Sequence, residues 1–424
     1  MQKEKLVPEI RFKGFDEDWR NKKIESFGIW LAGTSLENQF CKNGSHKVVN
    51  IGSFGPDFMY KDQGLRINLN DENKHFLLNK DDLVMILNDK TLEGRIIGSV
   101  LLIDKDNTYL YNQRIQRLSI DKMNYNPHYL FFLINNMGNH DILYKKSQGN
   151  TQIYLNWSVV SKINFLVSNQ LDEQQKIGAF FSNLDSLIQS QELKLKKLNE
   201  VRQSFLSKML ASKNQKFPEI RFKGFDDEWV KFKLGDIGIF NSNGVDKVFR
   251  EKDNVVHMVN YMDVYNKVEI TLNNIDRFMI TTANNSELIK NNLIKGDILF
   301  TPSSETIDDI GHTFVVHETI PNLVYSYHLV RFRPNSEEFD ETFANYCLDQ
   351  KRLCDQYMLR AQGVQRFVLN REHFNTLSVI KPSILEQKKI NKFLFSLDSL
   401  IHSQELKLEK LNNIKQALLE KMFC

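Results

Sequence analysis

The feature that most constrains this chain is an internal repeat. The stretch "PEIRFKGFDEDW" occupies Pro8–Trp19 and returns as "PEIRFKGFDDEW" at Pro218–Trp229, 210 residues later. A second and longer pair, Leu171–Leu210 and Ile384–Phe423, is offset by 213 residues and shares "LDSLI" and "SQELKL". Because segments that recur in the same order indicate a repeated structural unit, we expect two copies of one architecture.

The longer repeats are predicted to be helices. They are rich in Leu, Lys, Glu and Gln, and neither contains proline. Steps of four and three residues from Ile177 and from Ile390 meet an apolar side chain at most positions, which is typical of a coiled-coil seam. Each helix is the obvious partner of the other; two long core helices are the alternative. The predicted seam residues are Ile177, Phe181, Leu184, Ile188, Gln191, Leu195 and Leu198, and Ile390, Leu394, Leu397, Ile401, Gln404, Leu408 and Leu411.

Both seams are interrupted at the same two places. Gln191 and Gln404 are polar, and Arg202 is matched by Lys415. In an antiparallel pair we expect Gln191 to face Gln404, where paired amides would fix the register at some cost in stability.

The segments between the repeats are predicted to be globular and α+β. Short apolar runs such as "DLVMIL" (Asp82–Leu87) alternate with turn residues, and "PHYLFFLINNM" (Pro127–Met137) is typical of a short helix. The predicted organisation is a globule at 1–170, a helix at 171–212, a second globule at 213–383 and a helix at 384–424. We expect each copy of the opening motif to cap a long helix, and the N-terminus to lie near the end of the last helix.

Three local similarities align the two globules, which otherwise hardly share a sequence. "KDDLV" (Lys80–Val84) matches "KGDIL" (Lys295–Leu299), and "QGNTQIYLN" (Gln148–Asn156) matches "QGVQRFVLN" (Gln362–Asn370). The third pair is "LYNQRIQRL" from residue 110 and "VYSYHLVRF" from residue 324. A scaffold that is duplicated while its loops diverge is what we expect of two readers with two different targets.

This arrangement resembles the specificity subunit of Type I restriction-modification systems over essentially the whole chain. The resemblance rests on the duplicated "PEIRFKGF…W", the "GD-I-L" turn, the "QG…LN" loops and the paired "EQ..KI…LDSLI" helices. One departure is Asp81, which stands where the family has glycine.

The resemblance implies a non-catalytic protein with two target-recognition domains, each reading one half of a bipartite site in double-stranded DNA. It also implies that the helices pack antiparallel, set the spacer and bind two methyltransferase subunits that modify adenine. Restriction (motor-nuclease) subunits can then join. S-adenosylmethionine would belong to the methyltransferase partner, and ATP and Mg²⁺ to the restriction partner, with no cofactor bound by this chain.

Loop residues of types that address bases and phosphates are the candidate DNA contacts. For any one of them, a solvated surface residue is the alternative. In the first globule they are Lys90, Thr91, Arg95, Arg114, Arg117, Lys145, Lys146, Asn150 and Gln152. In the second they are Thr301, Ser303, Ser304, Thr306, His328, Arg331, Arg360, Gln362, Gln365 and Arg366.

The charge balance indicates that this chain alone would bind DNA weakly. The formal net charge is +3, and Lys and Arg outnumber Asp and Glu by 18 to 14 in residues 20–170 but not in residues 230–383, where they stand at 17 to 20. Because nonspecific affinity comes from neutralised phosphates, we expect partner subunits to supply much of that affinity.

Other function classes find little support. The chain has no G-x-G, no Pro-Pro pair and no phosphate-binding G-x-x-x-x-G-K-[ST]. Its four cysteines lie far apart, the histidines form no metal-ligand set, and Asp57 with Glu72 and Lys74 is read as a chance match to a nuclease pattern. Without a long apolar run or a signal peptide, we expect a cytoplasmic protein away from membranes. The remaining alternative is a duplicated coiled-coil adaptor that joins proteins without reading DNA.

Overall fold

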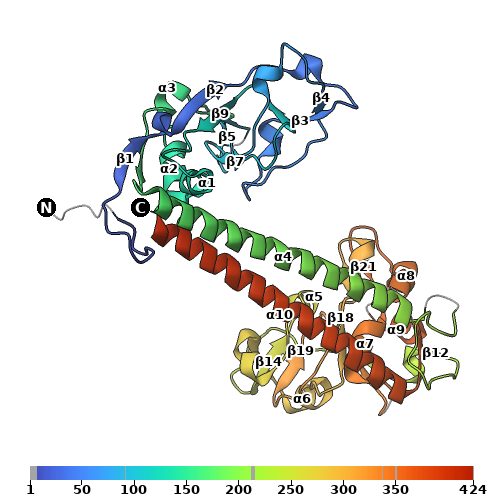
Figure 1. Ribbon diagram of the computed structural model, residues 1–424. Coiled ribbons are helices and arrows are strands. Elements are labelled where there is room, and N and C mark those ends of the chain that lie inside the picture. The colour runs from blue at the N-terminus through green and yellow to red at the C-terminus, as the bar shows by residue number, and fades with distance from the viewer. Residues whose placement is uncertain (1–6, 91, 212–214, 337, 349–350, 424) are drawn as a thin grey trace. The chain divides into compact units, whose positions relative to one another are not determined.

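The structure is a computed structural model that describes residues 7–90, 92–211, 215–336, 338–348 and 351–423. It divides into two compact units. Unit 1 comprises Met1–Leu193 with Glu405–Cys424, and unit 2 comprises Lys194–Gln404. The division cuts both long helices, α4 (Leu171–Met209) and α10 (Ile384–Met422), so each unit contains part of each helix (Figure 1).

The globule of unit 1 contains a four-stranded sheet in the order β2-β9-β5-β7 and a three-stranded sheet in the order β4-β3-β8. Every residue of β5 is buried: Leu83 and Met85 face one hydrophobic core, and Val84 and Ile86 face another, as alternation along a strand requires. The strands are β1 (Arg20–Lys23), β2 (Gly28–Ala32), β3 (His46–Val49), β4 (Arg66–Ile67), β5 (Leu83–Ile86), β6 (Asn88–Asp89), β7 (Val100–Leu102), β8 (Tyr109–Tyr111), β9 (Ile115–Ile120), β10 (Ile153–Tyr154) and β11 (Asn164–Val167). The short helices are α1 (Pro127–Asn135), α2 (Met137–Tyr144) and α3 (Trp157–Val160).

Unit 2 repeats this topology. Its sheets run β13-β20-β16-β18 and β15-β14-β19, and β12 pairs with β22 as β1 pairs with β11. The strands are β12 (Val230–Lys233), β13 (Gly238–Asn241), β14 (Asn254–Val259), β15 (Met279–Ala283), β16 (Ile298–Phe300), β17 (Ser303–Ser304), β18 (Thr313–Val315), β19 (Leu323–Tyr325), β20 (Val330–Pro334), β21 (Phe367–Val368) and β22 (Ser378–Lys381). The short helices are α5 (Tyr261–Tyr265), α6 (Asn285–Asn291), α7 (Glu341–Leu348), α8 (Lys351–Arg360) and α9 (Arg371–Thr376). The chain is therefore a duplicated protein of mixed α and β structure, and the predicted fold class is confirmed.

The repeated opening motif binds both long helices within its own unit. We call the contacts of the first motif clamp 1 and those of the second motif clamp 2. In clamp 1, the Arg11 guanidinium donates to both carboxylate oxygens of Glu173 at 2.6 and 2.9 Å, near the start of α4. The backbone N–H of Ile10 donates to the carbonyl of Lys421 at 2.9 Å, near the end of α10. The N-terminal segment thus lies at the end of the last helix, as the repeat predicts.

Clamp 2 has the same geometry with the helices exchanged. Arg221 donates to Glu386 near the start of α10, with both bonds at 2.7 Å, and the Ile220 N–H donates to the Lys208 carbonyl near the end of α4 at 2.9 Å. Both carboxylates are fully buried. Each motif therefore ties the start of one helix to the end of the other.

The glutamine after each of these glutamates joins the helix to the globule. Gln174 accepts a hydrogen bond from the Asn126 N–H at 2.8 Å, just before α1, and donates to the Ser168 carbonyl at 2.8 Å. Gln387 accepts from the Asp340 N–H at 3.0 Å, just before α7, and donates to the Pro382 carbonyl at 3.0 Å. The "EQ" pair thus fixes the start of each long helix against its own globule.

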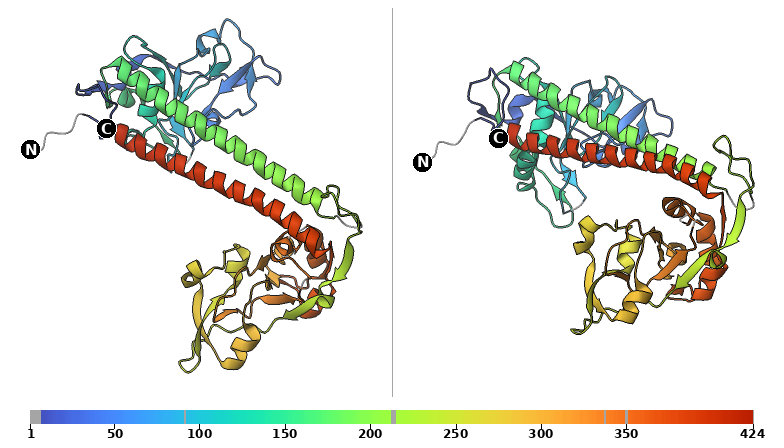
Figure 2. Two further views of the ribbon diagram at one scale, coloured as in Figure 1. Left: turned by 60° about the horizontal axis from the view of Figure 1, so that its bottom comes forward. Right: turned by 90° about the horizontal axis from the view of Figure 1, so that it is seen from below.

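The two helices pack antiparallel within each unit, and one ion pair in each sets the register. Lys415 lies 2.5 Å from Asp185 in unit 1, and Arg202 is paired with Asp398 in unit 2. The two pairs are equivalent under the repeat, so the basic interruptions of the seam are cross-helix ion pairs. The two further views agree on helices that run side by side (Figure 2). All fourteen predicted seam residues are buried or half-buried.

The predicted pairing of Gln191 with Gln404 is wrong. Starting from the Asp185–Lys415 pair, six residues along α4 and six residues back along α10 set Gln191 level with Glu409 and its neighbour Leu408. By the same reasoning from the Arg202–Asp398 pair, Gln404 lies level with Lys196 and its neighbour Leu195. Both carboxamide oxygens are buried without a hydrogen-bond partner among the described residues. The register follows the ion pairs and not the glutamines.

Candidate nucleic-acid interface

In each unit, a pair of two-residue strands brings together loops that are far apart in the sequence. In unit 1, β10 pairs with β6 and sets Ile153 opposite Asp89; in unit 2, β21 pairs with β17 and sets Val368 opposite Ser303. We call ribbon 1 the residues 88–90, 92–95 and 145–154, and ribbon 2 the residues 301–306 and 360–368. Most of the candidate DNA contacts lie on these two ribbons.

The "QG" loops of the two ribbons have the same backbone. Gln148 and Tyr154 exchange backbone hydrogen bonds at 2.9 and 2.8 Å, and Gln362 and Val368 do so at 3.0 and 2.8 Å. The following glycines are left-handed, with φ of +121° at Gly149 and +130° at Gly363. A Cβ at either position would overlap the carbonyl oxygen three residues later, so glycine is required for this closure. The loops therefore differ only in the side chains they present.

Each ribbon is also supported by a tyrosine hydroxyl. Tyr144, in α2, donates to the Leu92 carbonyl at 3.1 Å, and Tyr261, in α5, donates to the Ser303 carbonyl at 2.8 Å. The turn before the central strand, β5 in unit 1 and β16 in unit 2, is also alike in the two units. Asp81 takes a left-handed φ of +71°, close to the +90° of Gly296, and its carboxylate pairs with Lys122 at 2.8 Å. The aspartate therefore leaves the turn intact.

Ribbon 1 presents cationic and amide side chains. Lys90, Arg95, Lys145, Lys146, Asn150 and Gln152 are exposed, and Arg95 pairs with Glu93 at 2.7 Å. Arg114 is also exposed. It lies beside ribbon 1, because its carbonyl accepts the N–H of Leu87 at 3.0 Å. Thr91 lies outside the described residues. A surface of this kind suits contacts to phosphates and to base edges.

Ribbon 2 presents a different set. Thr306, Gln362, Gln365 and Arg366 are exposed and Ser303 is half-buried. The Nε and Nη2 atoms of Arg366 donate to the hydroxyl of Ser303 at 3.2 and 3.1 Å. This contact crosses the ribbon and fixes the guanidinium at its surface.

Basic side chains gather beside ribbon 2. His328 is exposed, and its ring lies 3.9 Å from that of Tyr327. Partial burial lowers the pKa of His328, and the positive charges of Lys247 and Arg366 lower it further. Lys247 and Tyr327 were not predicted from the sequence; the aromatic residue directly before His328 was an available signal, whereas nothing local marks Lys247.

Two arginines predicted to contact DNA belong to the interior. The Arg117 side chain is 11% exposed and donates to the buried Asp82 at 2.8 Å. Arg331 is buried and donates to the Asn292 carbonyl at 2.7 Å, while Arg333, two residues further along β20, pairs with Asp297. Arg331 and Arg333 lie on the same face of β20, because residues two apart on a strand share a face. Each unit therefore has one arginine paired with a buried aspartate, Arg117 with Asp82 in unit 1 and Arg333 with Asp297 in unit 2. The prediction that Arg117 and Arg331 face DNA is wrong.

Three further candidates also serve the scaffold. Thr301 is fully buried and its hydroxyl accepts the His312 N–H at 2.9 Å. Ser304 is buried and accepts the Thr306 N–H at 3.3 Å. Arg360 is half-buried and donates to Thr376 and to the Gln356 carbonyl at the end of α8. The prediction for Thr301 and Ser304 is therefore also wrong, whereas the prediction for the half-buried Arg360 stays a prediction.

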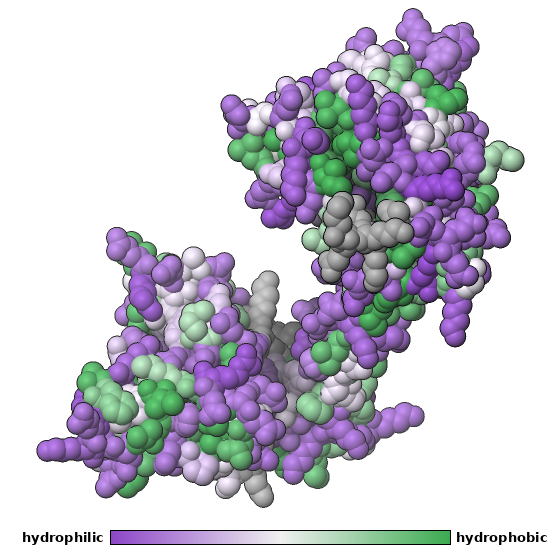
Figure 3. Space-filling view, turned by 90° about the vertical axis from the view of Figure 1, so that its left-hand side faces the viewer, coloured by the Kyte–Doolittle hydropathy of each residue, from purple (hydrophilic) through white to green (hydrophobic). Residues whose placement is uncertain are grey.

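The part of the chain that the structure describes contains neither a candidate metal site nor a candidate membrane-spanning helix. No cluster of three or more His, Cys, Asp or Glu there is suited to hold a metal ion. Lys74, from the nuclease-like match, is engaged by Asp71 at 2.9 Å. None of the described helices combines the length and apolar character of a membrane span. On the face shown in Figure 3, hydrophilic residues predominate and hydrophobic ones are scattered among them.

Two α/β units that present different side chains on one ribbon scaffold, and that share a pair of long helices, define a duplicated recognition protein. The family follows from comparison with known proteins. The model of the Type I restriction modification DNA specificity domain matches residues 16–201 and again 226–413, and the chain belongs to this family. The family is the non-catalytic specificity component of these systems, and the two matches correspond to two recognition domains.

Individual relatives agree with this assignment. A chain described as "Putative type I restriction enzyme MjaX specificity subunit", from Methanocaldococcus jannaschii, is 24% identical over 214 residues. That match covers 50% of this chain and 49% of the relative, so the chain spans about half the length of the curated relative it matches.

Two solved structures share the fold. The S subunit of a Type I restriction-modification system from M. genitalium is similar over 99% of both chains, with a TM-score of 0.61 and 16% identity. A chain from a structure concerned with complex assembly and conformational transition of the type I R-M system is similar over 96% of this chain and 97% of that one, with a TM-score of 0.54 and 13% identity. At these identities the similarity concerns the fold.

Proposed function

We propose that each unit reads one half of a bipartite DNA site through its ribbon, and that the paired helices set the spacer between the halves and bind two methyltransferase subunits. In this proposal, residues 1–170 and 213–383 are the recognition domains, and residues 171–212 and 384–424 are the scaffold. Methylation of adenine, with S-adenosylmethionine, takes place in the methyltransferase partner. Cleavage, with ATP and Mg²⁺, takes place in restriction subunits that join the complex.

The observation that carries the proposal is the contrast within the ribbons. Their backbone hydrogen bonds and required glycines are duplicated, whereas their exposed side chains differ. A duplicated structural spacer has no use for such selective divergence. Two readers of different sequences require it, because side chains that reach base edges carry the specificity and the scaffold only positions them.

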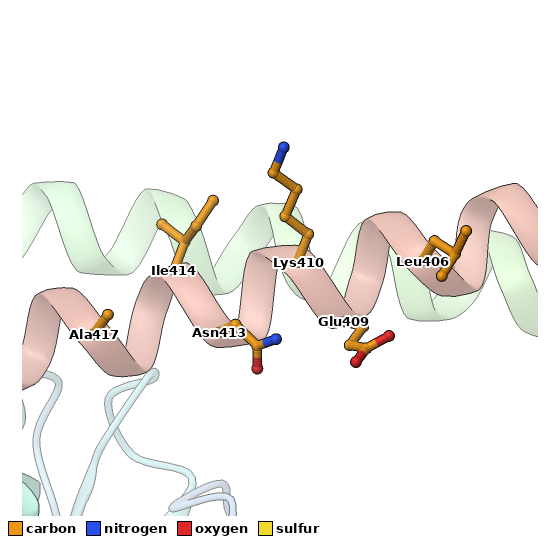
Figure 4. Close-up of a pocket in the computed structure, with 6 residues that line it drawn as sticks. All are labelled: Leu406, Glu409, Lys410, Asn413, Ile414 and Ala417. Atoms are coloured by element: carbon orange, nitrogen blue, oxygen red, sulfur yellow. The ribbon is translucent and has the colours of Figure 1, made fainter.

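The helices support the part of the proposal that concerns partners. A shallow groove on α10 is lined by Leu406, Glu409, Lys410, Asn413, Ile414 and Ala417. In Figure 4, Lys410 and Ile414 project to one side of the helix, and Glu409 and Asn413 project to the other. Leu406 is 52% exposed and Ile414 is 40% exposed.

The same exposed apolar residues recur on α4. Leu193 and Val201 are the repeat equivalents of Leu406 and Ile414, and they are 61% and 43% exposed. Exposed apolar residues at two equivalent positions of each helix suit two copies of one partner, which is the stoichiometry proposed for the methyltransferase. We expect the double substitution Leu406→Glu and Ile414→Glu to remove one methyltransferase from the complex, as measured by native mass spectrometry. Retention of both copies would contradict this docking site.

Methylation sequencing tests the reading function. Genomic DNA from a host that expresses this chain with the methyltransferase subunit of its system should carry N6-methyladenine in both halves of a split motif. The same host with the methyltransferase alone is the control. A soluble complex that leaves the DNA without a split motif would contradict the proposal and favour a protein–protein adaptor.

Matched insertions test the spacer. Seven residues added after Arg202 and seven added after Leu397 leave the proposed docking residues together, preserve the spacing of the seam and lengthen the helix pair by about 10 Å. With a rise of roughly 3.4 Å per base pair, the spacer should grow by about three base pairs. An unchanged spacer would contradict the ruler role, while an intact split motif would leave the reading function standing.

A further inference from the structure

One position on the ribbons is equivalent in the two units and carries a different side chain in each. Gln152 and Arg366 each stand four residues after the first glutamine of a "QG" loop, and the carbonyl of each is the one packed against the required glycine. Both side chains are exposed. The two units therefore hold a glutamine and an arginine at the same place on the same backbone.

The contacts of Arg366 leave its outer edge available. Its Nε and Nη2 atoms donate to the single hydroxyl oxygen of Ser303, on the opposite strand of ribbon 2. Among the described residues, Nη1 has no hydrogen-bond acceptor, and Nη2 carries a second hydrogen. The end of the guanidinium thus presents a fork of two donors that is already held in place.

These two side chains have different preferred partners in the major groove. An arginine fork donates to O6 and N7 of guanine, both of which are acceptors. A glutamine amide donates to N7 and accepts from the N6 amino group of adenine. Each bidentate contact discriminates by roughly 10- to 100-fold against the wrong base.

We propose that Gln152 and Arg366 are specificity-determining residues, with Gln152 selecting an adenine in the half-site of unit 1 and Arg366 selecting a guanine in the half-site of unit 2. This inference rests on the proposed reading function and goes further by assigning a purine to a named side chain in each half. The contact from Ser303 makes that residue a positioning residue for Arg366.

The test exchanges the two side chains and reads the methylated motif. With the methyltransferase present, Gln152→Arg should change one adenine to guanine in the first half of the motif, by about tenfold or more in preference. Arg366→Gln should change one guanine to adenine in the second half. The untouched half of each motif is an internal control for folding and assembly.

Two further variants separate base reading from phosphate binding. Thr151→Arg places the same charge on the neighbouring exposed residue and should leave the motif unchanged. Arg366→Lys keeps the charge but loses the fork, so it should relax the choice at that guanine by about tenfold while the second half is otherwise kept.

The outcomes are distinguishable. A base change confined to the predicted half supports the inference. An unchanged motif in Gln152→Arg and Arg366→Gln overturns it, and so does a uniform loss of methylation across all sequences, which is the behaviour of a phosphate contact. A native chain that produces no split motif overturns the proposed function itself, and the inference falls with it.

Discussion

The clamps and the ribbons of the two units have diverged in different ways. Clamp 1 and clamp 2 keep the same arginine and glutamate, since a buried carboxylate without its cation is strongly destabilising. Ribbon 1 and ribbon 2 share the same backbone hydrogen bonds, but nearly all of their exposed side chains differ. The residues that hold each unit together have therefore stayed the same since the duplication, whereas the residues that face outward have changed.

The largest effect is expected at the clamps, where the two units are not equal. Glu173 accepts hydrogen bonds from Arg11, from the Trp19 indole at 3.1 Å and from Ser168 at 2.5 Å. Glu386 accepts from Arg221, and the Trp229 indole N–H is buried without a partner among the described residues. Glu173→Ala should destabilise unit 1 by about 3–5 kcal/mol, because it leaves the Arg11 cation and the two buried donors of Trp19 and Ser168 without this acceptor.

The matched variant is Glu386→Ala, which should destabilise unit 2 by about 2–3 kcal/mol because it mainly leaves one cation unpaired. Hydrogen exchange measured by mass spectrometry, in increasing urea, reports on the two units separately. Equal losses in the two variants would show that the extra donors in clamp 1 carry no stability.

Alkaline pH is expected to destabilise both units alike. Burial raises the pKa of Tyr111 to about 12 and that of its repeat equivalent Tyr325 to about 12, against roughly 10 in an unfolded chain. A raised pKa stabilises the folded state below pH 10, and this contribution is lost as the pH rises from 10 towards 12. The free energy of unfolding should fall by up to about 1.4 kcal/mol per pH unit for each tyrosine.

Phenylalanine substitutions sharpen this comparison. Tyr111→Phe should reduce the alkaline loss in unit 1 at little cost at neutral pH, because its buried hydroxyl has no hydrogen-bond partner in the described chain. Tyr325→Phe should reduce the loss in unit 2 but cost about 1 kcal/mol, because the hydroxyl donates to the Asn241 carbonyl at 3.1 Å. Urea unfolding at pH 7 and pH 11 measures both terms, and an unchanged pH dependence would contradict this assignment.

The cross-helix ion pairs should differ by a smaller amount. Asp185 and Lys415 are about a quarter exposed, so Asp185→Ala should cost about 0.5–1 kcal/mol. Asp398 also accepts a hydrogen bond from the Tyr346 hydroxyl at 2.7 Å, so Asp398→Ala should cost about 1–2 kcal/mol. Chemical denaturation of both variants in low and high salt tests this, because only the ionic part is screened.

The smallest effect is expected at the seam glutamines. Replacing a buried amide that lacks a partner by an apolar residue of similar size removes a desolvation cost. Gln191→Leu and Gln404→Leu should each stabilise the chain by about 0.5–1 kcal/mol, as measured by urea unfolding. Destabilisation by either would mean that the amides have a structural role that the register does not reveal.

The long helices could be predicted from sequence because their signal is local and repeated. The alternation of four and three residues from Ile177 and Ile390 gave both the elements and their buried faces. The partner of Gln191 could not be obtained in this way, because periodicity defines a face and leaves the register free. Two ion pairs that join distant segments decide the register.

The site was predictable in part, for a similar reason. The "QG" loops were marked by a repeated motif, and their side chains are exposed. Arg117, Thr301 and Arg331 look like surface residues in the sequence, yet the structure buries their side chains against Asp82, the His312 backbone and Asn292. The strand pairs that join the ribbons are two residues long and more than sixty residues apart, so no local pattern indicates them.

The most direct test is to replace residues 20–167 by the corresponding segment of another member of the family, leaving both clamps and both long helices unchanged. Methylated DNA is then sequenced from a host that also expresses the methyltransferase subunit. The account predicts that one half of the split motif changes while the other half and the spacer stay the same. Coordinated changes in both halves, or an unaltered motif from a methylating complex, would contradict two independent readers on one scaffold.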